Sequence, residues 1–338
     1  MKSVLIVDGD STIPNLACMR LSSYHKSIGD NVSFRRLGLS YYPSKKNRRH
    51  FIDSNNFDIV YCSVIFTGTK DYIHGDDIIY GGTGHDLTTV LDSEVEQCEL
   101  DYSLYPDNDT SYGFISRGCS RKCYFCVVPQ KEGKTKEVSS IDDIVKHPRV
   151  KFMDNNFLSL PNHIELLEEL IDKNIKCQFN QGLDFRLLTE ENSNLLSKLN
   201  YDGDYIFAFD DYKYKNYMDK QIELLDWRKD WQMKFYVYVN PKMKCQDTVK
   251  RVEWLRDHKC LPYVMRDRAC WKSKYSQFYT DLAAYANQPA FFKKMTFDNF
   301  LVKRNGRNSS RVAFHSALYL GVFEFADDEV MTGQQELI

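Results

Sequence analysis

The sequence contains no stretch approaching the roughly 20 apolar residues of a transmembrane helix, although 43% of its 338 residues are hydrophobic. The apolar run in its opening, MKSVLIVDGD, is too short for a signal peptide. Net charge is small, because 45 Lys and Arg residues are balanced by 47 Asp and Glu residues, which leaves a formal charge of -2. We therefore predict a soluble, cytoplasmic protein with no membrane partner. Its net charge gives no reason to expect nucleic acid.

The first third of the chain alternates between apolar runs and an amphipathic segment. We predict strands at residues 3–8, 32–37, 57–66 and 76–82, with a helix between the first two. Continuous apolar strands separated by helices are typical of a parallel sheet with covered faces. Residues 1–95 are thus predicted to form an α/β domain, and the acidic, turn-rich residues 96–110 to form a linker.

Residues 111–288 alternate more regularly. Six apolar runs are separated by amphipathic helical segments such as HIELLEELIDKN and DTVKRVEWLRDHK. This order predicts a partial or complete barrel of parallel strands, (β/α)6 and TIM-type, with its chemistry at the C-terminal strand ends. Residues 289–338 break the pattern and are predicted to be a C-terminal extension.

Three of the ten cysteines, Cys119, Cys123 and Cys126, lie within eight residues, directly after the first predicted strand of this barrel. Free cysteines usually scatter into cores, so chance clustering is a weak explanation. A structural zinc site needs a fourth Cys or His, and no His lies within 20 residues on either side. An iron–sulfur cluster is the third explanation. Three thiolates would leave one iron of a [4Fe–4S] cluster without a protein ligand, which is a place for a small molecule.

The stretch CSRKCYFC resembles the signature of the radical S-adenosylmethionine (radical SAM) superfamily. The resemblance covers roughly residues 112–271. It implies that Cys119, Cys123 and Cys126 hold a [4Fe–4S] cluster whose fourth iron binds S-adenosylmethionine (SAM). It also implies that backbone near Tyr124 and Phe125 faces the adenine. An electron donor such as flavodoxin or ferredoxin would complete the system.

Polar residues follow the predicted strands, where a barrel site collects its ligands. The superfamily often holds the methionyl amine with a Gly-Gly-Glu-like motif after the second strand, and this chain has MDNNF there instead. We predict SAM contacts from that strand end and the next one, and substrate or SAM contacts from the three strands after them. The SAM candidates are Asp154, Asn155, Asn156, Gln181, Asp184 and Arg186, and the later candidates are Asp210, Asn240 and Arg266. For each, an ordinary turn or a rim ion pair is the alternative explanation.

The N-terminal domain resembles, in its place before the barrel, the cobalamin-binding, Rossmann-like domain of one large radical SAM group. That group often carries D-x-H-x-x-G after its first strand, whereas this chain has Asp10 and Ile13 in place of the His and the Gly. A His-ligated cobalamin is therefore disfavoured, and cobalamin binding without a His ligand stays open. The glycine-rich GGTGHD lacks the phosphate-loop pattern.

The N-terminal cysteines and the basic runs have ordinary explanations. Methylthiotransferases hold a second cluster with three N-terminal cysteines, but Cys18, Cys62 and Cys98 are better explained as scattered thiols. The basic runs at residues 44–50 and 303–311 are ordinary solvated loops or weak nucleic-acid contacts. A cobalamin-dependent methyltransferase and a non-catalytic protein with the cluster as a structural staple remain alternatives. The substrate is not specified by the sequence.

Overall fold

The computed structural model describes residues 1–39 and 49–319 and divides the chain into two compact units, Met1–Tyr112 and a second that starts at Gly113. Both are α/β units with parallel sheets, as the alternating apolar runs predict. No helix in the described part of the chain is both long and apolar enough to cross a membrane.

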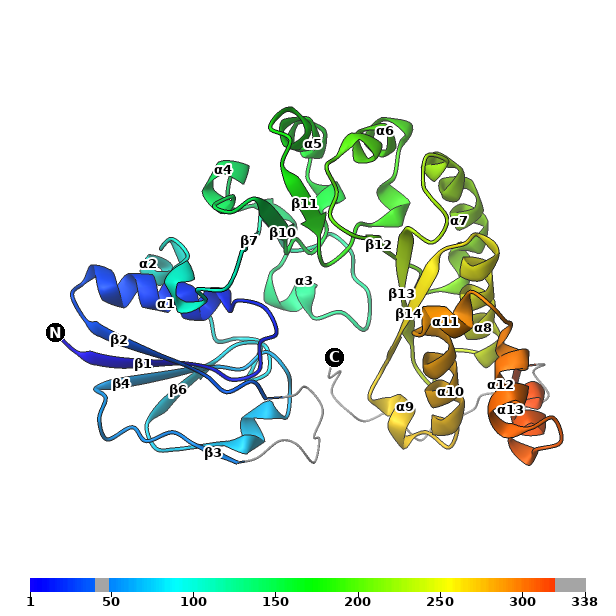
Figure 1. Ribbon diagram of the computed structural model, residues 1–338, viewed down its shortest axis with the longest axis horizontal. Coiled ribbons are helices and arrows are strands. Elements are labelled where there is room, and N and C mark those ends of the chain that lie inside the picture. Colours follow the sequence, from blue (N-terminus) through cyan, green and yellow to red (C-terminus); the bar gives the residue numbers. More distant parts are fainter. Residues whose placement is uncertain (40–48, 320–338) are drawn as a thin grey trace. The chain divides into compact units, whose positions relative to one another are not determined.

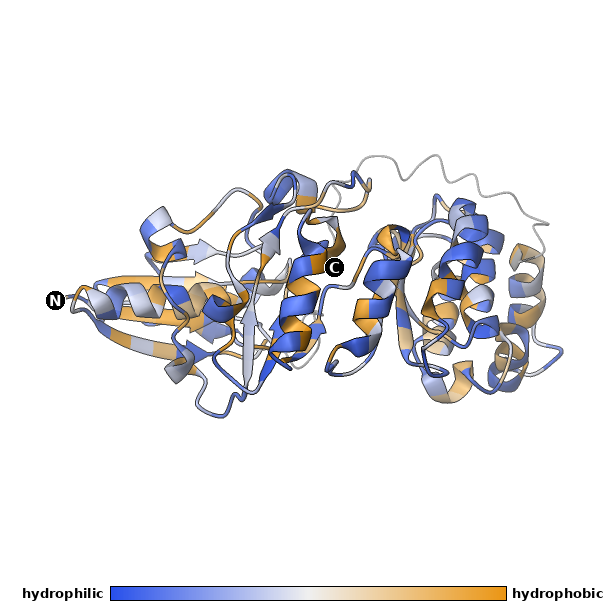
Figure 2. Cartoon of the chain, turned by 90° about the horizontal axis from the view of Figure 1, so that it is seen from above, coloured by the Kyte–Doolittle hydropathy of each residue, from blue (hydrophilic) through white to orange (hydrophobic). Residues whose placement is uncertain are grey.

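Unit 1 is built on a four-stranded parallel sheet of order β2-β1-β4-β6. The bounds are β1 Ser3–Asp8, β2 Asn31–Arg36, β4 Ile59–Ser63 and β6 Ile78–Gly81. Residues of β1 point alternately into two apolar clusters, so both faces of the sheet are covered. Hydrophobic residues dominate β1, β4 and β6, and orange segments mark this sheet in Figure 2, whereas β2 (NVSFRR) is mostly polar.

The sequence predicts helices between the strands of unit 1, but in the described residues only the first connection is an α-helix. Helix α1 (Leu16–Ser27) joins β1 to β2, and Asn15 caps it by accepting from Cys18 N. The described parts of the later connections contain a short parallel pair, β3 (His50–Phe51) with β5 (Ile73–His74), and a 3-10 turn instead of α-helices. One face of the sheet is therefore covered by irregular chain.

The acidic segment 96–110, predicted to be a linker, belongs to unit 1. Helix α2 (Ser93–Glu96) ends at its first residue. Asp101 accepts from Ser22 Oγ and Lys26 Nζ, both at 2.6 Å, and the Tyr105 hydroxyl donates to Asp8 Oδ2 at 2.9 Å. These bonds fasten the segment to α1 and to the end of β1.

Unit 2 has two three-stranded sheets, of order β11-β10-β7 and β12-β13-β14. The division between the units falls inside β7 (Thr110–Gly113). The other bounds are β10 Arg149–Phe152, β11 Lys176–Phe179, β12 Tyr205–Ala208, β13 Met233–Val239 and β14 Leu261–Arg266. The pairs β10–β11, β12–β13 and β13–β14 are parallel. An isolated bridge between Cys177 and Tyr201 and the bond from Leu183 N to Ile206 O lie between the sheets.

Helices follow the strands of unit 2, and those that follow β10 to β13 lie along the outer side of the arc that these strands form in Figure 1. Their bounds are α3 Val128–Lys131, α4 Ile141–Ile144, α5 His163–Asp172, α6 Glu190–Lys198, α7 Lys215–Gln221, α8 Cys245–Asp257, α9 Ala269–Lys272 and α10 Ser276–Ala286. One continuous apolar core lies between the helices and the sheets. Its aromatic members include Phe152, Phe179 and Phe235.

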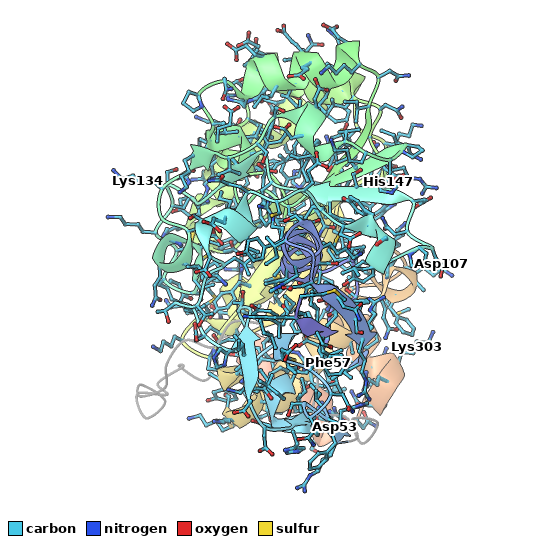
Figure 3. All side chains as sticks on the ribbon, turned by 90° about the vertical axis from the view of Figure 1, so that its left-hand side faces the viewer. Asp53, Phe57, Asp107, Lys134, His147 and Lys303 are labelled. Carbon is cyan, nitrogen blue, oxygen red and sulfur yellow. The ribbon has the colours of Figure 1, made fainter. Side chains whose placement is uncertain are left out.

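The C-terminal extension adds α11 (Pro289–Phe292), α12 (Phe297–Asn305) and α13 (Ser310–Tyr319). Asp281 on α10 is fully buried and pairs with Arg304 at 3.7 Å and with Arg311 at 3.0 Å. Lys303, labelled in Figure 3, is exposed beside them. Two charges of the basic run 303–311 therefore fasten the extension to α10.

Candidate functional site

Residues 118–127, called here the cysteine loop, connect the short strand β8 (Ser116–Arg117) to α3. β8 pairs antiparallel with β9 (Lys136–Glu137), which brings the two ends of the segment together. Gly118 has φ +89°, and a Cβ there would lie 2.3 Å from the carbonyl oxygen of Lys134. A glycine is thus required at the entry to the loop. Lys134 contributes only backbone to this contact, and its side chain points outward in Figure 3.

The end of β10 holds the start of the loop. Asp154 is buried and accepts from the Ser116 backbone N at 2.5 Å, from Ser116 Oγ at 2.7 Å and from Ile115 N at 3.3 Å. Asn155 Oδ1 accepts from Gly118 N at 3.1 Å. Two of the side chains predicted to contact SAM are therefore engaged with the chain that leads into the cysteine loop.

Burial raises the pKa of Asp154 to about 6, although the hydrogen bonds from Ser116 and Ile115 oppose the rise. A carboxylate can accept all three bonds at once, whereas a protonated carboxyl must use one oxygen as a donor. The charge on Asp154 thus favours the hydrogen bonds at the start of the loop.

Asn156, the next residue, is 3% exposed and touches the first cysteine directly. Its Nδ2 lies 3.4 Å from Cys119 Sγ and 3.4 Å from Asp184 Oδ2. Its Oδ1 is buried and has no hydrogen-bond partner among the described residues. A buried amide oxygen without a partner costs free energy unless a ligand donates to it, so Asn156 retains a free acceptor at the site.

Asp184, which follows β11, connects the loop to the next strand end. Its Oδ2 accepts from Arg121 Nε at 2.8 Å and its Oδ1 from Arg186 Nε at 2.8 Å. The two guanidinium groups lower the pKa of Asp184 against the effect of its burial. Arg186 also hydrogen-bonds to Cys123 through its side chain. Asp184 thus joins Cys119, through Asn156, to Cys123, through Arg186.

The three thiols of the loop are all half-buried, whereas Cys177, Cys245, Cys260 and Cys270 elsewhere in unit 2 are buried. Burial raises the pKa of Cys123, with Asp210 adding to the rise and Arg186 opposing it. Burial raises the pKa of Cys126 as well, while a hydrogen bond from Val128 N opposes the rise. Arg121 N points at Cys119 Sγ at 3.4 Å. Each sulfur thus has a nearby N–H donor, which suits thiolate ligands.

Within residues 1–39 and 49–319, no group of three or more His, Cys, Asp or Glu side chains is arranged so that it could hold a metal ion. Cys119, Cys123 and Cys126 are therefore not arranged as a mononuclear metal site in the described residues. A zinc ion would need the three sulfurs within about 4 Å of one another, because each Zn–S bond is about 2.3 Å long.

Aromatic residues connect the loop to β13. The Phe125 ring stacks on Tyr238, with centroids 4.1 Å apart and an interplanar angle of 17°, and Tyr124 meets Tyr238 edge to face at 6.0 Å. The Tyr238 hydroxyl donates to Asp267 Oδ2 at 2.5 Å and accepts from Asn240 Nδ2 at 3.2 Å. Tyr238 thus supports the loop, a role that the sequence analysis did not identify. Asn240, one of the predicted candidates, contacts this tyrosine.

Of the remaining candidates, Arg266 and Gln181 lie apart from these contacts, and Asp210 does not. Arg266 donates to Thr280 and lies over the Trp271 ring, on the side of α10. Gln181 is exposed. Asp210 accepts from Tyr238 N at 3.2 Å and influences both Cys123 and Cys126 electrostatically, so it belongs to the site.

Arg251 on α8 is a second residue that the sequence analysis missed. It is 1% exposed and donates to the carbonyl oxygens of Phe209 and Tyr238, each at 2.9 Å, at the ends of β12 and β13. Burial lowers its pKa to about 10. A cation at this depth adds positive potential to the strand ends beside the loop.

Unit 1 has its own pair of acidic residues after β1. Asp8 accepts from Ser11 N and from Tyr105, and Asp10 accepts from Ile65 N at 2.8 Å and Phe66 N at 2.9 Å. All four carboxylate oxygens have donors. The residue at the position of the cobalamin-ligating His is thus used to hold the loop after β4.

The glycine-rich segment of unit 1 packs on that same loop. A Cβ on Gly82 would lie 2.3 Å from Val64 O, and one on Gly84 would lie 2.5 Å from Phe66 O. Both glycines are explained by this close approach of two backbones. Cys18 and Cys62 are buried and Cys98 is half-buried, and burial raises the pKa of Cys62 to about 12.

The basic run at residues 44–50 lies mostly outside the described residues, as do Tyr41 and Tyr42. No family model matches the chain, and no curated protein matches its sequence. The geometry of the two units is therefore the basis for assigning a function.

Proposed function

We propose that this protein is a radical SAM enzyme in which Cys119, Cys123 and Cys126 hold a [4Fe–4S] cluster. The observation that carries the proposal is the group of three half-buried thiols on one loop, held by residues from β10, β11 and β13 or from the ends of these strands. A cluster with three protein ligands and bound SAM would supply an electron for reductive cleavage of SAM to methionine and a 5′-deoxyadenosyl radical, which abstracts hydrogen from a substrate.

The chain's own residues would position the ligands and bind SAM. Asp154 and Asn155 fix the entry of the loop, and Asp184 holds Arg121 and Arg186 beside the thiols. Asn156 Oδ1, buried and without a partner among the described residues, is an acceptor for the methionyl amine. Arg186 is committed to Asp184 and Cys123, which leaves part of its guanidinium for a carboxylate.

The proposal includes a partial (β/α)6 barrel, in which the two sheets of unit 2 curve together around the site. The bridge between Cys177 and Tyr201 and the helices that follow each strand support this arrangement. A flavodoxin or ferredoxin is the proposed electron donor. Unit 1 is proposed to be a Rossmann-like domain that serves as a substrate or partner domain, since Asp10 is bonded to backbone where cobalamin would need its ligand.

The structural-staple alternative is weaker because the loop and the residues just before it already donate hydrogen bonds to Asp154, Asn155 and Asp184. To test the proposal, the protein is reconstituted anaerobically, mixed with SAM and dithionite, and assayed for 5′-deoxyadenosine by mass spectrometry. We expect formation by the wild-type protein and none by Cys126→Ala. An intact cluster without any 5′-deoxyadenosine would refute the enzymatic proposal and favour the staple.

A further inference from the structure

The sheet β12-β13-β14 has one covered face and one open face. Along β13, Phe235 and Val237 point into the core, and Phe235 lies near Trp254 of α8. The residues between them point the other way. The other face, called here the open face because Tyr263 on it is exposed, consists of Ile206 and Ala208 on β12, Lys234, Tyr236 and Tyr238 on β13, and Leu261, Tyr263 and Met265 on β14. Ile206 and Tyr238 are buried, and the members other than these two and Tyr263 are partly buried.

Tyr263 is the unusual member of the open face. It lies in the middle of β14, opposite Tyr236 in the ladder, yet it is 43% exposed. The two rings meet edge to face, with centroids 5.9 Å apart. An exposed aromatic ring inside a strand, braced by a second ring, is a surface on which a planar ligand can stack.

Among the strand residues of the open face, Lys234 carries the only charge. Lys234 Nζ lies 5.5 Å from the centroid of the Tyr263 ring, and it forms no ion pair with a carboxylate among the described residues. The strand residues of this face include no Asp or Glu. A half-buried lysine against a ring, without a counter-ion, favours an anionic group beside a stacked ligand.

The open face leads directly to the cysteine loop. Tyr238 belongs to the same face as Tyr236, about 7 Å further along β13, and its ring stacks on Phe125 of the loop. A ligand stacked on Tyr263 would thus lie about one strand repeat from the residues that support the cysteines.

We propose that the open face binds the substrate of this enzyme, and that the substrate is a nucleotide or a molecule that contains one. Its base stacks on Tyr263, and its phosphate lies near Lys234. This inference rests on the proposed function for the meaning of "substrate", but the binding site itself does not require the cluster. A nucleotide would use both side chains, because its base can stack on the tyrosine ring and its phosphate can accept from the lysine ammonium group.

The test is equilibrium dialysis of the full-length reconstituted protein against each of the four ribonucleoside 5′-monophosphates. The matching nucleosides supply the ring without the charge, and inorganic phosphate supplies the charge without the ring. We expect at least one monophosphate to bind roughly tenfold more tightly than either comparison probe. Tyr263→Ala should weaken its binding about tenfold and Lys234→Gln about threefold, while Tyr263→Phe should retain the wild-type affinity.

Matched controls are Phe51→Ala, which removes an exposed ring from unit 1, and Lys259→Gln, which removes a surface lysine paired with Asp230. Neither should change binding. The proposal is overturned if no monophosphate binds better than its nucleoside and phosphate, or if Tyr263→Ala leaves the affinity unchanged. Iron content, measured on the same samples, reports separately on the cluster, so a failure of the proposed function is distinguishable from a failure of this site.

Discussion

The two units place acidic residues at the ends of parallel strands, but they use them differently. In unit 1, Asp8 and Asp10 are saturated by donors from neighbouring chain, and the thiols nearby are buried. In unit 2, Asp154 and Asp184 hold a loop whose own thiols remain half-exposed. The same kind of sheet edge surrounds buried thiols in one unit and half-exposed thiols in the other. The hydrogen-bond partners, rather than the fold class, thus distinguish the proposed site from the edge in unit 1.

The comparison predicts its largest effect for the cysteines. Cys126→Ala should abolish cluster binding, because a thiolate ligand is lost, whereas Cys62→Ala in unit 1 should leave the iron content unchanged. Iron and sulfide per protein after anaerobic reconstitution measure both. Equal iron loss in the two variants would remove the distinction between the units.

The second-largest difference between the two units is expected when their acidic residues are substituted. Asp184→Asn leaves Arg121 and Arg186 without a carboxylate and should lower the free energy of unfolding by about 3 kcal/mol, with a fall in iron content. Asp10→Asn should destabilise unit 1 by about 2 kcal/mol, because one of two backbone donors loses its acceptor, but should leave the iron content unchanged. Urea unfolding and iron assays check the pair. A drop in iron for Asp10→Asn alone would contradict the account.

A pH dependence should follow from Asp154, whose pKa is raised to about 6 by burial. Between about pH 4 and pH 6 the folded protein retains a proton that the unfolded chain has released. The stability due to this group is fully present below pH 4 and is lost as the pH rises to 6, by about 3 kcal/mol. Asp154→Asn should lack this change. The difference between the two unfolding free energies, followed from pH 4 to pH 6.5, should therefore vary with pH, and a constant difference would be evidence against a buried, titrating Asp154.

The smallest effect is expected at Gln181, a predicted SAM contact whose side chain is exposed. Gln181→Ala should change the free energy of unfolding by less than about 0.5 kcal/mol, as for most surface substitutions. It should also retain the full iron content. A marked loss of cluster in this variant would show that the loop depends on Gln181 in the loaded protein.

Apolar periodicity predicted the strands of both units well, since Ser3–Asp8 and Leu261–Arg266 are strands in the structure. It did not predict that Asp101 and Tyr105 fasten the acidic segment to unit 1, because their partners lie about 75 to 97 residues away in sequence. Asp154 illustrates the same limit. Its position after a strand predicted a SAM contact, but the sequence does not reveal that its carboxylate accepts a hydrogen bond from Ser116 Oγ.

Arg251 left a detectable signal in the sequence. It lies on the same helical stripe as Thr248 and Leu255, both buried, so a cation there had to find partners inside the protein. Tyr238 left none, because an aromatic residue in a strand is ordinary and its stacking on Phe125 depends on the fold.

The central claim is that the loop's three thiols hold a [4Fe–4S] cluster with one iron open to SAM. Electron paramagnetic resonance of the dithionite-reduced protein, recorded without and with SAM, tests it most directly. The account predicts a [4Fe–4S]⁺ signal that changes its g-values when SAM is added and is absent in Cys126→Ala. A reduced cluster whose spectrum SAM does not alter, or a signal that persists in Cys126→Ala, would contradict it.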